Sequence, residues 1–316
     1  MIRRVKKFFR KLLPSFYSWL WQVRHREEII ARAARRRENQ DNVIKYLENA
    51  PDEERRALCS FIRDNGLGNF PYPFILKYSA DDIEVLKDTG RDERYVLYEG
   101  KKLFFKKTWE DADVRAYYNG LRIEQDPDSP HHYFGKSEYL PSEGDIIADV
   151  GVAEGIWALS MIERCGRAYL FESDKEWIAA LEATFEPWKD KVVIVNRFVG
   201  AADDGKNFVT LDSFFDGKRI DCIKADIEGA EEEMLRGGAA SFRDKISKAV
   251  ICSYHNCGDE QMIKGYLGEY GFGKIETSDG YMIFGVFEEE TLEPPYISRG
   301  LVFARKNPTE GKEGFP

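Results

Sequence analysis

Long apolar runs are missing from this sequence of 316 residues. A membrane-spanning helix needs roughly 18 or more apolar residues in a row, and no stretch of the chain approaches that length. Hydrophobic residues make up 43% of the chain and charged residues 33%, which is typical of a globular protein and excludes a disordered or collagen-like one. The sequence therefore predicts a globular protein that is long enough to be an enzyme.

Cysteine is also scarce. The chain has five cysteines, an odd number, and they are widely scattered and mostly flanked by apolar residues. Such spacing provides neither a disulfide framework nor a zinc or iron–sulfur motif. We therefore expect reduced thiols and a cytoplasmic protein.

A general excess of positive charge is missing too, because the formal net charge is -9. Nucleic-acid-binding proteins usually carry a basic face, so we expect no nucleic-acid partner. The exception is the N-terminal segment, since residues 1–37 hold 12 Lys and Arg against two Asp and Glu. Apolar residues in this segment recur at helical spacing, and two interpretations stay open. In one, residues 2–21 form a basic amphipathic helix that lies on anionic lipid at the inner face of the membrane. In the other, the helix docks on the protein itself or is disordered in solution, and Pro14 favours this second interpretation because it breaks the periodicity.

Alternating strands and helices dominate the second half of the chain. Helices are expected at residues 27–50, 53–63 and 111–123, and short strands at 95–98 and 102–105. From residue 145 onward, strands expected at 146–150, 168–172, 192–195, 220–225 and 249–253 alternate with helical segments, and strands at 274–277, 281–287 and 300–305 follow without a helix between them. This order predicts an α/β fold with a doubly wound, mostly parallel seven-stranded sheet, a helical N-terminal extension and a small lead-in subdomain.

Four segments follow from these patterns. Residues 1–37 form the basic segment, 38–140 the lead-in subdomain, 141–306 the cofactor-binding domain and 307–316 a loose tail.

The first strand of the alternating region ends in a glycine turn that contains Asp149, Gly151, Val152 and Gly155. Glycines at these positions allow a sharp turn and let a cofactor lie against bare backbone at a helix N-terminus. The dinucleotide motif G-x-G-x-x-G is absent, because Ala153 and Ile156 stand where it needs glycine. An acidic turn of this kind favours a cofactor without phosphates, and S-adenosylmethionine is a cationic candidate.

Polar residues also follow three other strands, and ligands bind at such strand ends in open α/β sheets. Glu172 ends the second strand and is placed to accept hydrogen bonds from ribose hydroxyls. Asp226 and Glu228 follow the fourth strand, and Tyr254 and His255 follow the fifth. Glu231 and the two glutamates after it are interpreted as the acidic first turn of a helix.

These motifs together resemble the FkbM-type methyltransferases. The similarity is carried by Asp149-x-Gly151-x-x-x-Gly155, Phe171-Glu172, the run 210–215 (TLDSFF) and the run 220–237, which contains Asp226-Ile-Glu228-Gly-Ala-Glu231. It covers residues 144–306, and a weaker similarity to members that act on glycans extends through 124–133. The turn departs from the family pattern at Ala153-Glu154, and Ser173 replaces a frequent proline.

The resemblance implies methyl transfer from S-adenosylmethionine to a hydroxyl group, commonly of a sugar or other small molecule. We expect His255 to be the general base, Asp226 to orient it or the substrate while also lining the cofactor site, and Glu228, Tyr254 and His131 to contact the acceptor. A divalent metal held by Asp226 and Glu228 is a less favoured alternative.

Two other functions stay open. Asp126-Pro127-Asp128 resembles the metal-binding D-x-D of glycosyltransferases, and the basic end suits a membrane-bound adaptor that keeps the fold without catalysis. Intact glycines in the turn argue against lost cofactor binding. Methylation of nucleic acid is disfavoured, because the fourth strand ends in Asp-Ile-Glu-Gly rather than an N-P-P-Y type of loop.

Overall fold

The computed structural model describes residues 26–285 and 291–307. The chain divides into two compact units, Met1–Pro71 with Gly285–Tyr296 and Tyr72–Phe284 with Ile297–Pro316. The first break in the chain falls after Pro71, inside the predicted lead-in segment 38–140. The basic helix predicted over residues 2–21 and most of the tail lie outside the described residues.

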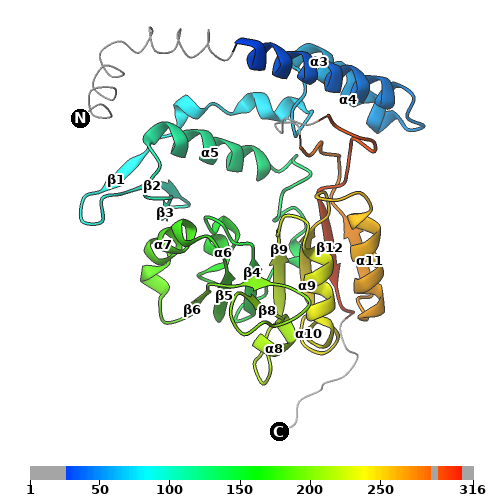
Figure 1. The fold of residues 1–316 in the computed structure, drawn as a ribbon. Coiled ribbons are helices and arrows are strands. Elements are labelled where there is room, and N and C mark those ends of the chain that lie inside the picture. The colour runs from blue at the N-terminus through cyan, green and yellow to red at the C-terminus, as the bar shows by residue number, and fades with distance from the viewer. Residues whose placement is uncertain (1–25, 286–290, 308–316) are drawn as a thin grey trace. The chain divides into compact units, whose positions relative to one another are not determined.

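Among the residues that the structure describes, the first unit contains two helices, α3 (Arg26–Glu48) and α4 (Glu53–Asn65), which confirm the two helices predicted there (Figure 1). Asp52 caps α4, because its carboxylate accepts a hydrogen bond from the backbone N–H of Arg55 at 2.9 Å. Apolar residues from both helices are almost fully buried, including Val43, Leu47, Leu58 and Ile62.

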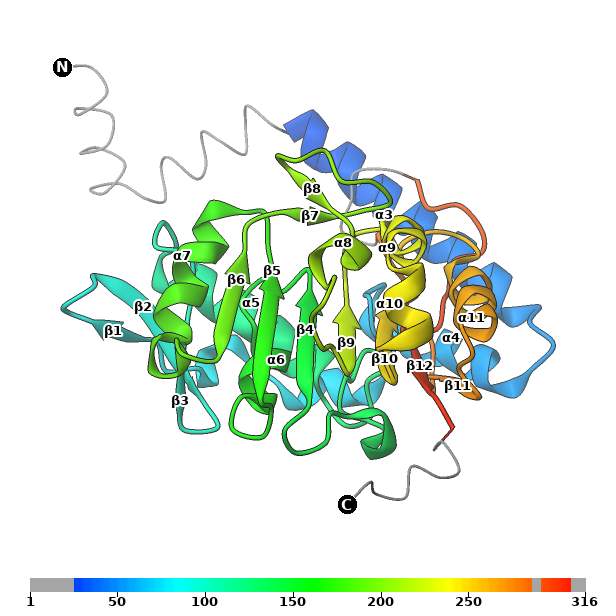
Figure 2. The same ribbon diagram turned by 90° about the horizontal axis from the view of Figure 1, so that it is seen from below.

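A seven-stranded sheet forms the centre of the second unit (Figure 2). Its strands are β4 (Ile146–Val150), β5 (Arg167–Phe171), β6 (Val192–Val195), β9 (Cys222–Ala225), β10 (Lys248–Cys252), β11 (Lys274–Thr277) and β12 (Leu301–Arg305). The spatial order is β11-β12-β10-β9-β4-β5-β6. From β10 through β9, β4 and β5 to β6, each strand is parallel to the next one. Strand β12 is antiparallel to both of its neighbours, β10 and β11. The predicted doubly wound α/β fold is confirmed.

Helices cover both faces of this sheet. They are α6 (Ile156–Met161), α7 (Lys175–Thr184), α8 (Leu211–Phe214), α9 (Glu231–Gly237), α10 (Ala239–Asp244) and α11 (Asp259–Glu269). Successive strand residues point to opposite faces, so Ile147 packs with α6 and α7 whereas Ala148 packs with the helices from α8 to α11. The near-continuous apolar strands thus match a sheet that is buried on both faces.

Residues 72–140 pack onto this sheet domain. They form a meander of β1 (Leu86–Asp88), β2 (Glu93–Tyr98) and β3 (Lys101–Phe104), followed by α5 (Asp111–Glu124). The Tyr98 hydroxyl lies 2.8 Å from Ser160 Oγ on α6, and the Phe104 N–H donates to Thr184 Oγ1 at 3.0 Å on α7. The short, partly buried strand β1 was not predicted.

The prediction of a strand at 281–287 is wrong for residues 281–285, the part of it that the structure describes. Residues 281–285 form only an isolated bridge between Met282 and Ser298. Both edges of β12 are already occupied, by β10 and β11, so the sheet has no place for another strand there. Gly285 also leaves the extended region, with φ +76°.

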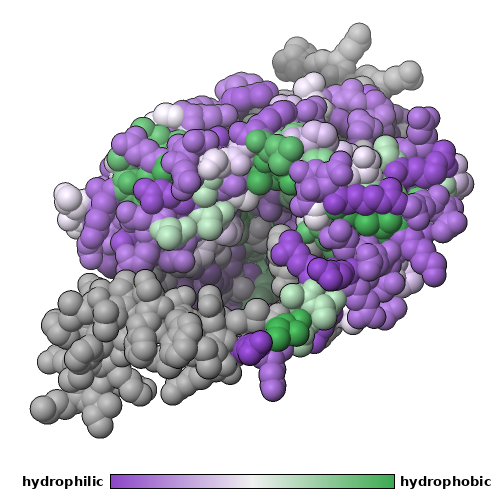
Figure 3. Space-filling model, turned by 90° about the horizontal axis from the view of Figure 1, so that it is seen from above, coloured by the Kyte–Doolittle hydropathy of each residue, from purple (hydrophilic) through white to green (hydrophobic). Residues whose placement is uncertain are grey.

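Two short strands, β7 (Phe198–Val199) and β8 (Phe208–Val209), pair in parallel outside the main sheet. Within the described residues, no helix has the length and apolar character that crossing a bilayer requires. The face shown in Figure 3 is mostly hydrophilic, and its apolar residues appear there as separate patches.

Candidate active site

The candidate site lies where parallel strands β4, β5, β9 and β10 end. Because these strands are parallel neighbours, the residues that follow them meet at one edge of the sheet. The structure therefore brings together the glycine turn after β4, Glu172 after β5, Asp226 after β9 and His255 after β10.

The glycine turn has backbone geometry that requires glycine at two positions. Gly151 has φ +70°, and a Cβ atom there would lie 1.8 Å from the carbonyl oxygen of Asp226. Gly155 has φ +89° and precedes α6, where a Cβ atom would come within 2.9 Å of Leu181 and Phe185. The N–H groups of Gly151 and Val152 donate to the Phe171 carbonyl at 3.1 and 3.2 Å. The turn is thus hydrogen-bonded to the end of β5 and lies close to the backbone of Asp226 after β9.

Asp149, predicted to line the cofactor, is fully buried behind the turn. Its Oδ1 lies 3.1 Å from Lys224 Nζ, and the same ammonium group donates to the Gly151 carbonyl at 3.1 Å. Burial raises the pKa of Asp149 to about 6, against the opposing effect of Lys224. Asp149 is therefore linked to the glycine turn through Lys224, which contacts both Asp149 and the Gly151 carbonyl. Lys224 was not predicted, since a lysine inside an apolar strand gives no sign of its partner.

Glu172 is held rigidly by the backbone. One carboxylate oxygen accepts from the N–H groups of Ser173 and Asp174 at 2.7 and 2.8 Å, and the other accepts from Ala153 at 2.9 Å. A carboxylate has about four acceptor positions, so this arrangement leaves capacity for one further donor. The half-buried Glu172 therefore joins the second strand end to the glycine turn.

Two further acids close to the site were missed by the sequence interpretation. Glu154, in the turn itself, is 4% exposed and accepts from the Tyr117 hydroxyl at 2.8 Å, and burial raises its pKa. Burial, and then the charges of Asp226 and Glu154, raise the pKa of Glu124 to about 8. The departure from the family pattern at Ala153-Glu154 was the one signal that could have identified Glu154.

Asp226 is the centre of the hydrogen-bond network. Tyr133 donates to its Oδ2 at 2.8 Å and Tyr254 donates to its Oδ1 at 3.2 Å. Burial acts to raise the pKa of Asp226, but the charge of Lys224, followed by His131 and His255, outweighs it and holds the pKa at about 2. Asp226 is therefore a fixed, ionised acceptor at neutral pH.

His255 lies between two carboxylates. Its Nδ1 is 3.0 Å from Glu231 Oε1, and its Nε2 is 3.4 Å from Asp226 Oδ1. The imidazole is only 3% exposed and packs against the rings of Tyr254 and Phe284. Burial acts to lower the pKa of His255, but the contact with Glu231 and then the charge of Asp226 raise it above the ordinary value.

Glu231 corrects the sequence interpretation. It does begin α9 together with two more glutamates, as predicted, but it is fully buried and faces His255, whereas Glu232 and Glu233 are exposed. Its Oε1 also accepts from the Ile227 N–H at 3.2 Å. No difference in residue type distinguishes these three glutamates, so sequence alone could not find the inward one.

The remaining predicted residues differ in accessibility. Glu228 is 85% exposed and its Oε2 lies 3.7 Å from His255 Nε2. His131 is buried, with Nε2 3.7 Å from Asp226 Oδ2 and 3.5 Å from the Cys252 sulfur, and burial lowers its pKa to about 4. His131 is therefore neutral, and its buried ring lies beside the Asp226 carboxylate.

Two groups of three side chains within the described part of the chain bring metal-ligand atoms within 4.8 Å of one another, His131 with Asp226 and Cys252, and Asp226 with Glu231 and His255. Asp226 already accepts two tyrosine hydroxyls, and His255 turns different ring nitrogens toward Asp226 and Glu231. These side chains are therefore arranged more like a network of polar contacts than like the coordination sphere of one metal ion.

The Asp126-Pro127-Asp128 run forms a structural turn. Asp126 is 2% exposed and accepts from the Tyr78 hydroxyl at 2.6 Å, and Lys77 Nζ pairs with both carboxylates at 3.2 and 3.3 Å. These contacts use the carboxylates that a glycosyltransferase would need for its metal.

The part of the chain that carries this site is similar to a known protein family. The model of the methyltransferase FkbM domain matches residues 121–272, which begin inside α5 and therefore include the 124–133 segment. No curated protein matches the chain.

Solved structures similar to this chain at low identity include the three that follow. A methyltransferase FkbM from Methylobacillus flagellatus has a TM-score of 0.43 and 17% identity, covering 61% of this chain and 53% of its own. Precorrin-6y C5,15-methyltransferase from Geobacter metallireducens has a TM-score of 0.37 and 12% identity, with 54% and 85% covered. TrmK from M. capricolum, solved with S-adenosyl-homocysteine, has a TM-score of 0.35 and 14% identity, with 53% and 65% covered. The chain thus spans about half the length of the first of these structures.

Proposed function

We propose that this protein, whose residues 121–272 match the model of the methyltransferase FkbM domain, transfers the methyl group of S-adenosylmethionine to a hydroxyl group of a sugar, glycan or related small molecule. The observation that carries the proposal is the position of His255, between Glu231 and Asp226, at the same strand ends as the glycine turn.

The donor set around the turn fits S-adenosylmethionine. Glu172 has capacity for a ribose hydroxyl, and Glu154, Glu124 and Asp226 place negative charge or acceptors where a cation would be stabilised. Bare backbone at Gly151 and Gly155 allows close approach. The bound cofactor would supply an electrophilic methyl carbon attached to a positively charged sulfur.

The residues of this chain would align the acceptor and remove its proton. In the overall transfer the acceptor hydroxyl would exchange its proton for the methyl group that the cofactor would supply. His255 Nε2 takes the hydroxyl proton, and Glu231 stabilises the resulting imidazolium through Nδ1. Asp226 and Tyr254 position the acceptor, with Glu228 at the exposed side. Such alignment accounts for much of the rate of a bimolecular transfer.

Incubation of the full-length protein with methyl-labelled S-adenosylmethionine and a panel of hydroxylated glycans tests this function. We expect label in an O-methyl product, formed about 10²–10⁴-fold more slowly by His255→Ala. Binding of a sugar nucleotide together with failure to bind S-adenosylmethionine would support the glycosyltransferase alternative. Cofactor binding without turnover on any acceptor would support the adaptor alternative.

We also propose that residues 1–37 attach this enzyme to the anionic inner face of the membrane. Their excess of Lys and Arg supports this, because each basic residue near an anionic surface contributes about 1 kcal/mol of attraction. A cytoplasmic location follows as part of the same proposal.

A further inference from the structure

A cavity lies in the first unit, outside residues 121–272. It has a volume of about 530 Å³, which is within the usual range of small-molecule sites. Its walls come from α3, the start of α4 and residues 294–296, and include Asn42, Lys45, Tyr46, Asn49, Arg55 and Tyr296. None of these residues belongs to the site described above.

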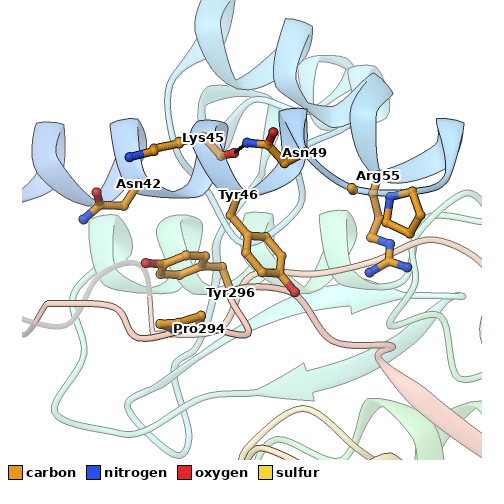
Figure 4. A pocket seen from close by; sticks show the side chains of 9 residues that line it. Asn42, Lys45, Tyr46, Asn49, Arg55, Pro294 and Tyr296 are labelled. Atoms are coloured by element: carbon orange, nitrogen blue, oxygen red, sulfur yellow. Dashed lines mark hydrogen bonds between the residues drawn. The ribbon is translucent and has the colours of Figure 1, made fainter.

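The lining combines aromatic rings with polar groups. The rings of Tyr46 and Tyr296 meet edge to face, with centroids 5.3 Å apart and an interplanar angle of 84°. Figure 4 shows these rings in the middle of the cavity, with Asn42 and Lys45 toward one end and Arg55 toward the other. Tyrosine hydroxyls and asparagine amides can both donate and accept hydrogen bonds, so they match ligand hydroxyl groups.

The charge of the lining favours an anion. Arg55 and Lys45 are its charged residues, and no carboxylate lines the cavity among the residues that the structure describes. Arg55 shares its guanidinium with Asp52, the residue that caps α4. Lys45 forms no ion pair with any described residue, so its ammonium group is available to a ligand. Asn49 is fixed beside it, because its amide donates to the Lys45 carbonyl at 2.7 Å.

We propose that this cavity binds an acidic saccharide, with a sugar ring against Tyr46 and Tyr296 and a carboxylate paired with Lys45. Aromatic side chains provide rigid apolar contact to the C–H faces of a sugar, and their hydroxyl ends contact its polar groups. A lysine adds a charge-assisted hydrogen bond that a neutral sugar lacks. This inference does not depend on the acceptor of methyl transfer.

Titration of the full-length protein with oligogalacturonate, without S-adenosylmethionine, tests the proposal. We expect saturable binding that weakens about tenfold or more in Lys45→Gln, because a charge-assisted hydrogen bond is lost. Lys45→Arg should restore most of the affinity. Lys189→Gln is the matched control, since Lys189 is an exposed lysine on the second unit and its loss should change nothing. Tyr296→Ala should also weaken binding, with thermal unfolding measured to confirm that the variant is folded.

Two comparisons separate this site from general attraction of anions by the basic N-terminal segment. A neutral oligosaccharide should bind more weakly than oligogalacturonate, and polyglutamate, which has charge but no hydroxyls, should be insensitive to Tyr296→Ala. The proposal would be overturned if Lys45→Gln weakened the binding of oligogalacturonate and of polyglutamate equally while Tyr296→Ala changed neither. It would also be overturned if none of the variants changed the binding of oligogalacturonate. Intact methyl transfer in Lys45→Gln would leave the proposed function standing in either case.

Discussion

Glu231→Gln removes one charge from the candidate general base and keeps the size of the side chain. In the parent protein Glu231 Oε1 lies 3.0 Å from His255 Nδ1, and this contact helps to raise the pKa of His255. A general base acts only in its neutral form, so parent activity should rise as pH increases through that raised pKa. Without the charge the pKa of His255 falls, and the rising limb should move to lower pH.

The size of this shift follows from the geometry. Hydrogen bonds to charged groups contribute about 1.5–3 kcal/mol and neutral ones about 0.5–1.5 kcal/mol, so the substitution removes on the order of 1 kcal/mol. One pKa unit corresponds to roughly 1.4 kcal/mol, and we therefore expect the limb to move by somewhat less than one unit. His255→Ala removes the base altogether and should lower turnover by about 10²–10⁴-fold.

The measurement is turnover against pH at saturating S-adenosylmethionine, with cofactor affinity from calorimetry. Glu233→Gln is the control, since Glu233 is an exposed glutamate in the same helical turn.

Thermal stability gives a second measurement. Because the pKa of His255 is raised in the folded protein, its protonation stabilises the fold at pH values below the unfolded pKa near ~6.5, and this contribution disappears as pH rises through the folded pKa. The difference in melting temperature between parent and Glu231→Gln should therefore be larger at acidic pH.

An unchanged pH limb in Glu231→Gln would refute the role of Glu231. Near-normal turnover in His255→Ala would place the base elsewhere, with Asp226 as the next candidate. Loss of activity on adding a chelator would then select a metal held at Asp226, whereas indifference to chelator would select the carboxylate itself.

Three other substitutions or deletions test the cofactor turn, its support and the N-terminal segment. Gly151→Ala should abolish S-adenosylmethionine binding in calorimetry, because its Cβ meets the Asp226 carbonyl, whereas Gly144→Ala, with a similar φ of +76° and nothing within 4 Å, should only lower stability by about 1–2 kcal/mol. Lys224→Met leaves Asp149 buried without its partner and should cost about 3–5 kcal/mol in thermal unfolding, and adding Asp149→Asn should recover part of that loss; equal stability of the single and double variants would contradict the ion pair. Deleting residues 1–22 should release the protein from anionic vesicles in co-sedimentation and leave turnover of a soluble acceptor intact, whereas unchanged sedimentation would favour a helix docked on the protein.

The parts of the fold that could be predicted are those encoded by local sequence. Strands such as β4 and β10 are short apolar runs followed at once by a turn or polar residues, and their alternation with helices fixes the fold class. The glycine turn was predictable for the same reason, because Gly151 and Gly155 follow such a strand directly. Strand-end position then brought Glu172, Asp226 and His255 to one edge of the sheet.

The parts that could not be predicted depend on contacts between distant positions. Tyr133 and Asp226 are 93 residues apart, and nothing in either local sequence indicates that the hydroxyl donates to the carboxylate. The same holds for Tyr117 and Glu154. β1 was missed because its three residues, Leu-Lys-Asp, lack the apolar character of a strand and gain stability from pairing with β2.

Lys224 links the glycine turn to the surroundings of the candidate base, His255. A buried ammonium group is costly unless it is paired, and this one lies on the central strand β9 with an exposed fraction of 4%. It contacts Asp149 and the Gly151 carbonyl, and its charge contributes to the low pKa of Asp226. The same cation therefore holds the glycine turn in place and keeps Asp226 ionised beside His255. Because one residue supports both halves of the site, Lys224→Met should weaken S-adenosylmethionine binding and shift the pH profile together, whereas substitutions at Glu172 or Glu231 should affect only one of the two.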